Sequence, residues 1–325
     1  MSQYLCDVFT TPEADLHRVS LPELAQMRGI PSSKQRLLQR YFGLQSVVLS
    51  HQDLIPMLFG PLAQMVDAHP DLMQSQGLLL YVRTQTHATH AGVDWLAQLA
   101  GQVGLGHWEV MVQTQTHCAG GLAALDLVQG LQQPVIVLAG EKCFHPVSAN
   151  QSGAALGEAP VAALLRPDHG KWRLSHVRTQ HLPQFHANPD RMTDTLRKDW
   201  EKGFGAFMED FLRDTLAEFN FAPDQFDLVV PYNLNLPLLT LLARRMGWQD
   251  RLYTQSLPRV GHLFCADVFF NLAQVLPDTT AQRLLCFAAG MGATFSAIVL
   301  ERSGITMPDD RLSHSGRTLC AVSPI

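Results

Sequence analysis

The stretch Thr116-His117-Cys118-Ala119-Gly120-Gly121 joins an apolar strand-like run, residues 108–114, to an apolar helix-like run, residues 118–131. A cysteine in this place lies at a helix N-terminus, where unpaired backbone N–H groups and the helix dipole favour the thiolate over the thiol. The small residues that follow allow a substrate to approach the sulfur closely. We therefore predict that Cys118 is a nucleophile that accepts an acyl group. The alternative is a buried structural cysteine.

The composition is that of a globular protein with low charge. Of the 325 residues, 46% are hydrophobic and 16% are charged, and the net charge is −5 without a dense Lys/Arg run. These values argue against nucleic acid as the main partner. No apolar stretch approaches the roughly 18 residues that span a bilayer, and the first residues lack the pattern of a signal peptide. The six cysteines show no paired spacing, so we expect a reduced, cytoplasmic protein without a membrane partner.

Short apolar runs alternate with helical patterns along the chain, which is typical of an α/β fold. We expect strands at 77–82, 108–114, 134–139, 159–165, 172–179, 227–230, 283–289 and 294–300. We expect helices at 21–28, 33–41, 52–68, 90–103, 118–131, 193–219, 236–246 and 265–276. The chain divides into two similar halves, 1–175 and 176–325, and each half has a hairpin-like pair of strands, 159–165 with 172–179 and 283–289 with 294–300.

Six segments in order resemble ketoacyl-ACP synthase III-like proteins of the thiolase superfamily. Residues 116–121 resemble the nucleophile turn of that family. The others are Thr84-Gln85-Thr86-His87-Ala88-Thr89-His90 (the segment before the nucleophile strand), residues 153–164 (a glycine-containing turn and strand), Val230-Pro231-Tyr232-Asn233-Leu234-Asn235 (usually VPHQAN), Val260-Gly261-His262 (the HGN turn) and Gly290-Met291-Gly292-Ala293-Thr294-Phe295 (the C-terminal glycine loop). The resemblance implies the thiolase fold, with two similar halves stacked in α-β-α-β-α layers.

The resemblance also implies a set of site residues. Cys118, His262 and Tyr232 would be catalytic, and the backbone N–H groups of Cys118 and of the loop with Gly290 and Gly292 would form an oxyanion hole. Asn235, His117 and Phe295 would bind substrate. No cofactor and no metal are implied, and the histidines show no zinc-finger spacing. A homodimer is implied, with His87–His90 near the partner subunit.

The chain departs from the family's Cys, His and Asn set at two positions. Tyr232 stands where the family has His, and His262 stands where it has Asn, a place that holds His in related branches. We expect the His262 imidazole within hydrogen-bond reach of the Cys118 sulfur. A phenol, with a pKa of about 10, donates a hydrogen bond but is a poor neutral acceptor, so Tyr232 is either a donor or part of the pocket wall.

These departures favour one reaction over another. Decarboxylation of a malonyl thioester needs donors on the thioester oxygen, whereas acyl transfer to an amine or hydroxyl needs one base, a role for His262. Lys34, Arg36 and Arg40 are more typical of a solvated helix face than of a phosphate site, which favours an acyl carrier protein over coenzyme A as donor without excluding either.

The first hypothesis is therefore an acyltransferase that moves an acyl group from an ACP or CoA thioester through Cys118 to a small-molecule amine or hydroxyl acceptor, in specialised metabolite biosynthesis. The second is a carbon–carbon-forming condensing enzyme. The third is a non-catalytic partner subunit of an active paralogue. Retention of Cys118, His262 and the loop glycines argues against the third.

Overall fold

The computed structural model describes residues 3–85, 94–114, 116–143, 154–185, 193–290 and 293–304. Its strands are β1 (Gln3–Thr10), β2 (His17–Ser20), β3 (Ser46–Leu49), β4 (Leu78–Val82), β5 (Glu109–Gln113), β6 (Val135–Ala139), β7 (Val161–Arg166), β8 (Trp172–His181), β9 (Leu228–Pro231), β10 (Arg283–Gly290) and β11 (Thr294–Arg302). All eight strands expected from the sequence are present within a few residues. The first three strands were not expected.

The helices also lie close to their expected positions. They are α1 (Leu21–Arg28), α2 (Ser32–Arg40), α3 (Leu54–Ala68), α4 (Trp95–Gln102), α5 (Gly120–Leu127), α7 (Asp194–Glu218), α8 (Leu236–Met246), α9 (Leu257–Val260) and α10 (Asp267–Val275). Helix α5 follows a short 3-10 turn, η3 (His117–Ala119), and α10 follows a similar turn, η7 (Phe264–Ala266). None of the described helices is both long and apolar enough to cross a membrane.

Strand pairing repeats along the chain. The nine-stranded sheet has the order β5-β4-β6-β7-β1-β8-β11-β10-β9. In the first part, β1 and β7 are antiparallel, β7 and β6 are antiparallel, and β6 and β4 are parallel. In the second, β8, β11, β10 and β9 are joined by the same succession of pairings. Because the same succession of strand pairings occurs twice, we propose that the second half begins with β8, close to the division expected from the sequence.

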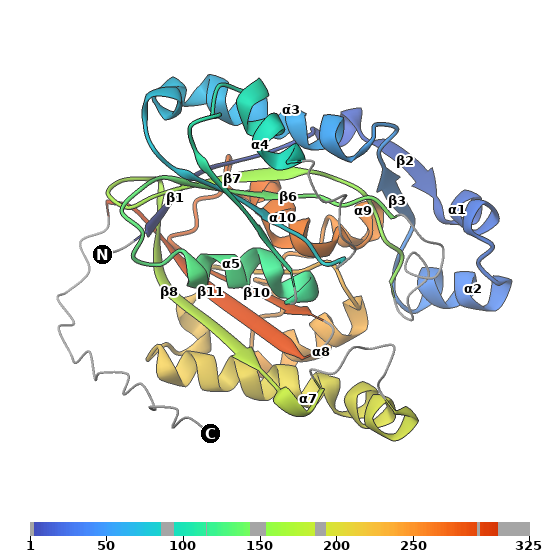
Figure 1. Ribbon diagram of the computed structural model, residues 1–325. Helices are drawn as coiled ribbons and strands as arrows, with labels where there is room; N and C mark the ends of the chain where they lie inside the picture. The colour runs from blue at the N-terminus through green and yellow to red at the C-terminus, as the bar shows by residue number, and fades with distance from the viewer. Residues whose placement is uncertain are drawn as a thin grey trace, which may run out of the picture.

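The helices form three layers around the two halves of the sheet. Figure 1 shows α3 and α4 above the first half, α5 and α10 between the halves, and α7 and α8 below the second half. The central helices face a sheet on both sides, which requires an apolar surface nearly all round. Accordingly, residues 120–125 of α5 and 267–272 of α10 are all buried. The thiolase fold expected from the sequence is therefore confirmed.

One expected pairing is wrong. Strands β7 and β8 do not form a hairpin, because β1 lies between them and pairs with both. The burial of β1 does not alternate, and its register with β7 shifts between Leu5 and Asp7. A strand without a period of two gives no clear sequence signal. The second expected hairpin, β10 with β11, is confirmed.

The two central helices begin close to each other. A Cβ added to Gly121 would lie 2.4 Å from the carbonyl oxygen of Cys265, and one added to Gly120 would lie 3.0 Å from the Cys265 sulfur. The first distance leaves room only for glycine at position 121, and the second allows a larger residue at position 120 only if the Cys265 side chain shifts. The glycines that the sequence analysis assigned to substrate approach therefore also allow η3 and η7 to pack together.

Candidate active site

Cys118 lies in η3, directly before α5, and its side chain is buried. The preceding residue, His117, has a φ of 47°, in the left-handed region that non-glycine residues rarely adopt. Strain of this kind persists only where the surrounding structure enforces it, and it is common at functional sites. Here the left-handed conformation of His117 shapes the turn before α5 and so positions the sulfur of Cys118.

His262 comes from the other half of the chain and meets this sulfur. Its Nε2 lies 3.1 Å from the Sγ of Cys118. The backbone N–H of His262 donates to the carbonyl of Ala155 at 3.0 Å, and the side chain is almost completely buried. The structure thus brings together the two residues that the sequence analysis placed at the reaction centre.

Asp267, at the start of α10, holds the far side of the imidazole. Its Oδ2 lies 2.5 Å from Nδ1 of His262. The same carboxylate accepts hydrogen bonds from the backbone N–H groups of Asn233 at 2.7 Å and of Leu263 at 2.6 Å. A carboxylate accepts only, so Nδ1 carries the proton and Nε2 is left to accept the proton of the thiol.

Sequence reasoning missed Asp267. The available signal was an acidic residue in the first turn of an expected helix, five positions after His262. An acid at that place is commonly explained by the helix dipole alone. Its position opposite the imidazole became visible only when the turn between them was known.

The charge of the site favours a protonated imidazole. Burial by itself lowers the pKa of His262, but Asp267 and Cys118 raise it, and together they hold the pKa well above its ordinary value of 6.5. Each of these two groups acts both through its charge and through a hydrogen bond. The imidazole therefore readily holds a proton next to the sulfur.

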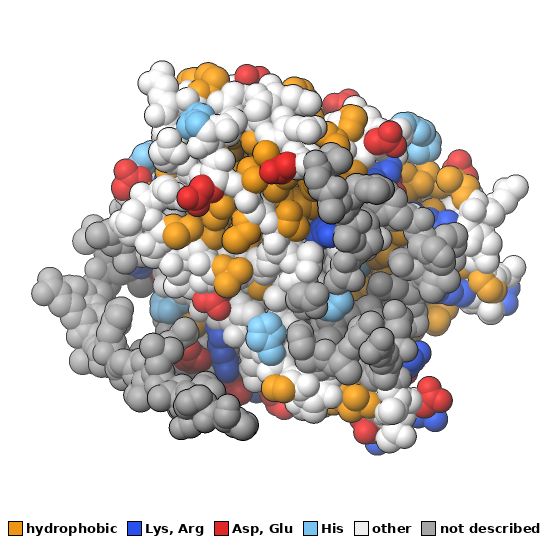
Figure 2. All heavy atoms as spheres, in the orientation of Figure 1, with side chains coloured by type: hydrophobic (Ala, Val, Ile, Leu, Met, Phe, Trp, Pro, Cys, Tyr) orange, Lys and Arg blue, Asp and Glu red, His pale blue; other side chains and the backbone are white. Residues whose placement is uncertain are grey.

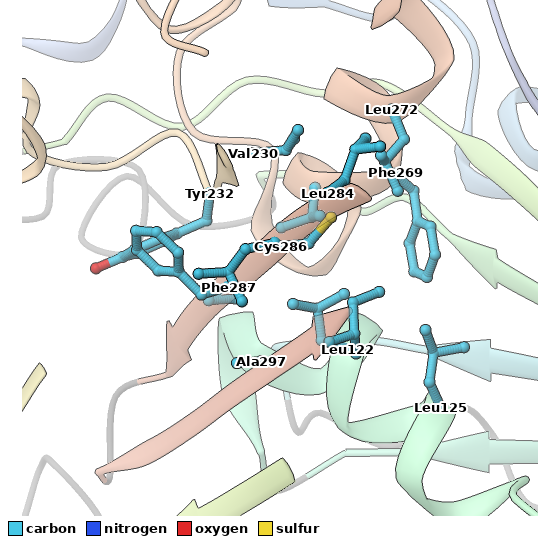
Figure 3. Packing of buried hydrophobic residues seen from close by; sticks show 14 of the residues in the cluster. Leu122, Leu125, Val230, Tyr232, Phe269, Leu272, Leu284, Cys286, Phe287 and Ala297 are labelled. Atoms are coloured by element: carbon cyan, nitrogen blue, oxygen red, sulfur yellow. The ribbon is translucent and has the colours of Figure 1, made fainter. Parts of the chain in front are cut away.

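Tyr232, at the end of β9, lies beside this pair. Its ring is edge-on to that of His262, with ring centres 6.4 Å apart. Figure 3 shows its ring beside Phe287 and its oxygen directed away from the hydrophobic cluster. Among the described residues, the buried hydroxyl has no hydrogen-bond partner. Burial raises the pKa of Tyr232 far above its usual range, so the phenol stays protonated and can only donate or accept a hydrogen bond as a neutral group.

Cys265 is a second thiol near the centre, on η7. Its Sγ lies 3.0 Å from the carbonyl oxygen of His117, to which it donates. The Oγ1 of Thr84 lies 3.3 Å from this sulfur and 3.7 Å from that of Cys118. Burial raises the pKa of Cys265 well above its ordinary value. Its proton is engaged by a backbone carbonyl, which fits a structural thiol.

The other expected site residues are distributed around this centre. Gly290, at the end of β10, lies against the nucleophile turn, since an added Cβ would be 2.2 Å from the carbonyl oxygen of Thr116. Gly292 and His87–His90 lie outside the described residues. Phe295 lies in β11 and stacks on Phe211 of α7 at 5.5 Å, within the aromatic cluster of the outer layer. No described group of three or more His, Cys, Asp or Glu side chains could hold a metal ion.

Asn235 has a structural task that the sequence analysis did not foresee. It is the N-cap of α8, with a φ of 56°, and its Oδ1 accepts from the backbone N–H of Leu238 at 3.2 Å. Together with His262, it also lines a small crevice. The remaining walls of this crevice are Leu38, Phe42, Leu44, Ala154, Ala155, Asn233, Leu257 and Gly261. The crevice thus has Leu38 of α2 and the imidazole of His262 among its walls.

Comparison with known proteins shows what the chain is similar to. Residues 216–302 match the family model of the 3-oxoacyl-[acyl-carrier-protein (ACP)] synthase III C terminal. This C-terminal part of the chain is similar to ketoacyl-ACP synthase III, and the whole chain has the thiolase fold. No curated protein sequence matches it.

Several solved structures share the fold of this chain over nearly its whole length. ChlB3, an acyltransferase, is 18% identical, with 93% of this chain and 98% of that chain covered and a TM-score of 0.76. The 3-oxoacyl-[acyl-carrier-protein] synthase III from Aquifex aeolicus is 14% identical, with 92% and 99% covered and a TM-score of 0.74. AbyA1, a tetronic acid condensing enzyme, is 17% identical, with 92% and 99% covered and a TM-score of 0.71.

Proposed function

We propose that this protein is an acyltransferase that moves an acyl group from an ACP or CoA thioester, through Cys118, to an amine or hydroxyl group of a small molecule. The observation that carries the proposal is the hydrogen-bonded triad of Cys118, His262 and Asp267. Its two contacts are 3.1 Å between Cys118 and His262 and 2.5 Å between His262 and Asp267. A thiol, an imidazole and a carboxylate in this order form an activated nucleophile with an oriented base. A non-catalytic partner subunit would not need such a triad.

In the first step the donor loads the enzyme. Nε2 of His262 takes the Cys118 proton, and the sulfur attacks the thioester carbonyl. The bond between that carbonyl and the donor sulfur breaks, and His262 gives the proton to the departing thiolate, which leaves as a thiol. The N–H groups of Cys118 and of the loop at Gly290 would donate to the transient oxyanion.

In the second step the acceptor discharges the enzyme. Loading converts the Cys118 sulfur to a neutral thioester and so removes one of the two charges that raise the pKa of His262. The imidazole therefore loses its proton more readily in the loaded enzyme and accepts one from the acceptor O–H or N–H. The acceptor attacks the thioester carbonyl, its bond to Cys118 breaks, and His262 gives the proton to the sulfur.

The site is less suited to decarboxylative condensation. That reaction forms an enolate on a thioester oxygen, which needs strong donors. Among the described residues, His262 supplies the imidazole that contacts Cys118, and its Nδ1–H donates a hydrogen bond to Asp267. Tyr232 offers one phenol in the place of a second imidazole. Acyl transfer does not form the enolate, so this arrangement does not hinder it.

The test is to separate loading from discharge. The protein is incubated with acetyl, octanoyl and benzoyl thioesters of N-acetylcysteamine, and intact mass spectrometry follows the acyl adduct. The loaded protein is then offered amines and alcohols. Loss of the adduct with formation of an amide or ester supports the proposal. Rapid carbon dioxide release from a malonyl thioester with a β-keto product would favour the condensing enzyme instead.

We expect Tyr232→His to raise carbon dioxide release from a malonyl thioester, because an imidazole supplies a second donor for the enolate. One oxyanion donor contributes roughly 3–4 kcal/mol. Tyr232→Phe is the matched control, since it removes the hydroxyl and keeps the ring in its apolar surroundings. Equal carbon dioxide release from all three proteins would contradict the assignment of this position.

We expect Asp267→Asn to slow discharge of the acyl enzyme by about tenfold or more, because an amide can hydrogen-bond Nδ1 in either orientation and no longer fixes the tautomer. The carboxylate raises the pKa of His262, so its loss lowers that pKa. Discharge needs a neutral imidazole, so the rate of discharge rises as the pH passes through the pKa of His262. The midpoint of the profile should therefore move to lower pH, which a purely structural role for Asp267 would not produce.

We further propose a cytoplasmic homodimer. Strand β5 is the end of the nine-stranded sheet, and Met111 and Val112 on it are 42% and 45% exposed. Figure 2 shows apolar side chains gathered on the face of the molecule that carries α4 and α5 in Figure 1. An apolar, unpaired edge strand is a template for pairing with another chain. Analytical ultracentrifugation gives the mass of the assembly, and Val112→Lys should yield a monomer.

A further inference from the structure

A larger cavity lies at the end of β11 that is remote from Cys118. Its volume is about 550 Å³, within the range of small-molecule sites. Strand β11 begins at Thr294, which pairs with Gly290 beside the nucleophile turn, and it ends at Arg302, which lines the cavity. At roughly 3.3 Å per residue, the strand separates these two ends by about 26 Å. The cavity is therefore separate from the active site.

The wall formed by the loop between β7 and β8 is packed tightly against β1. A Cβ added to Gly170 in this loop would lie 2.6 Å from the Cβ of Tyr4. The Sγ of Cys6 donates to the carbonyl oxygen of His169 at 3.3 Å. These contacts fix the loop, so the cavity exists before a ligand arrives, as is usual for small-molecule sites.

The charge of the cavity is positive. Three permanent cations line it, Arg166, Lys171 and Arg302, together with one carboxylate, that of Asp7. The Oδ1 of Asp7 pairs with the Lys171 ammonium, and its Oδ2 lies 2.8 Å from Nε2 of His69. This carboxylate is therefore engaged, and it does not neutralise the two guanidinium groups.

Arg166, the last residue of β7, brings a nearly buried charge into the cavity. Its side chain is only 9% exposed. Among the described residues, its ion-pair partner is Asp71, at 2.8 Å, and that side chain is 60% exposed. A guanidinium has five N–H donors, and a buried charge is costly unless it is paired and hydrogen-bonded. An anion in the cavity would supply acceptors for the donors that this one pair leaves.

Arg302 offers a second guanidinium, which neutral groups hold in place. Its Nε donates to the carbonyl of Ala281 at 3.1 Å, and an Nη donates to the carbonyl of Thr279 at 2.5 Å. Its guanidinium carbon also lies 4.6 Å from the ring centre of Trp172. These contacts orient the group and leave its charge without a counter-ion among the described residues.

We propose that this cavity binds the phosphate group of an organic molecule that also carries hydroxyl groups. A phosphate monoester has close to two negative charges at neutral pH and three strong acceptor oxygens. Two guanidinium groups match it, because each presents a planar pair of donors to phosphate oxygens. Asp7 keeps free lone pairs that can accept from a ligand hydroxyl.

The size of the cavity favours an organic phosphate over the free ion. A water molecule occupies about 30 Å³, so a phosphate ion would fill only a small part of the 550 Å³. Arg166 comes from the first half of the chain and Arg302 from the second. A ligand that contacts both should therefore also stabilise the protein against thermal unfolding.

The experiment uses ribose 5-phosphate as the probe, with ribose and inorganic phosphate as comparison ligands at constant ionic strength. Isothermal titration calorimetry measures the Kd for the wild-type protein, Arg166→Gln and Arg302→Gln. Arg244→Gln is the matched control, because it removes the same charge from an exposed position of α8. Arg302 is less buried than Arg166, so its variant keeps the test informative if the loss of Arg166 impairs folding.

We expect the wild type to bind ribose 5-phosphate more tightly than inorganic phosphate, and ribose not to bind. Each cavity variant should weaken binding of ribose 5-phosphate by about tenfold or more, and Arg244→Gln should leave it unchanged. Ribose 5-phosphate should raise the unfolding temperature of the wild type. Loading of Cys118 by a thioester should be the same in all four proteins, because neither cavity arginine contacts the active site.

Three results would overturn the proposal. The first is no binding of ribose 5-phosphate by the wild type at millimolar concentration. The second is an equal Kd in the wild type and both cavity variants, which would mean binding elsewhere on the surface. The third is equal affinity for inorganic phosphate and ribose 5-phosphate, which would leave the organic part without a role. Each result leaves the acyltransferase proposal intact, because loading of Cys118 is measured separately.

Discussion

Cys118→Ala is expected to abolish the acyl adduct completely, because the proposed chemistry has a single nucleophile. Mass spectrometry of the intact protein after incubation with the loading thioester measures this directly. Peptide mapping of the wild-type protein should place the added mass on Cys118. An adduct of equal amount in the variant, or mapping to another cysteine, would contradict the proposed function.

Cys143→Ala is the matched control for this experiment. Cys143 is more exposed than Cys118, yet burial still raises the pKa of its thiol to about 11. The thiolate is the nucleophile, so a thiol with such a pKa reacts slowly at neutral pH. Loading should therefore be unchanged in Cys143→Ala, although this sulfur is easier to reach. Unchanged loading would show that the reactivity of a cysteine in this protein depends on the neighbours of its sulfur and not on its exposure.

His262→Ala is expected to lower turnover by roughly 10²–10⁴-fold, the usual contribution of a general acid–base group. Loading and discharge should both slow, because the same imidazole moves the proton in each step. His262→Gln is the second variant, since an amide can hydrogen-bond the sulfur but cannot take up its proton. Turnover near that of the wild type in either variant would rule out His262 as the base.

A spectroscopic readout separates this chemical role from a loss of folding. Circular dichroism should give the same spectrum for wild type and His262→Gln, because the new side chain is also polar and can reach Asp267. Alkylation of Cys118 by iodoacetamide should slow at neutral pH in the variant, since the imidazole no longer receives the thiol proton. Unchanged alkylation with lost turnover would mean that His262 acts on the acceptor alone.

The sequence predicts the repeated strand–helix pattern well, because buried strands such as β4 and β6 are continuous apolar runs. It misses β1, whose irregular register and mixed burial give no periodic signal. It also suggests a hairpin between β7 and β8, because neighbours in sequence are commonly neighbours in a sheet. Only the three-dimensional topology shows that the first strand of the chain separates them.

At the site, Cys118 and His262 stand out in the sequence because their turns resemble family motifs. Asp267 does not, because its role depends on contacts with His262 and with a segment far away in the chain. Asn233 is 34 residues before Asp267, and its backbone N–H, not its side chain, makes that contact. Phe295 differs from Asp267 in the opposite way. Its motif position led us to expect substrate binding, but its ring packs against Phe211 of α7 in the outer layer.

The nucleophile belongs to the first half of the chain, whereas its base and the carboxylate behind it belong to the second half. Neither half alone contains a complete set of reacting groups. Turnover is therefore a reporter of assembly, since it requires that both halves have folded and docked across the central helices. During synthesis on the ribosome, the Cys118 thiol emerges long before its base, which lies 144 residues further along the chain. The protein therefore acquires its chemistry only once residues of both halves are in place.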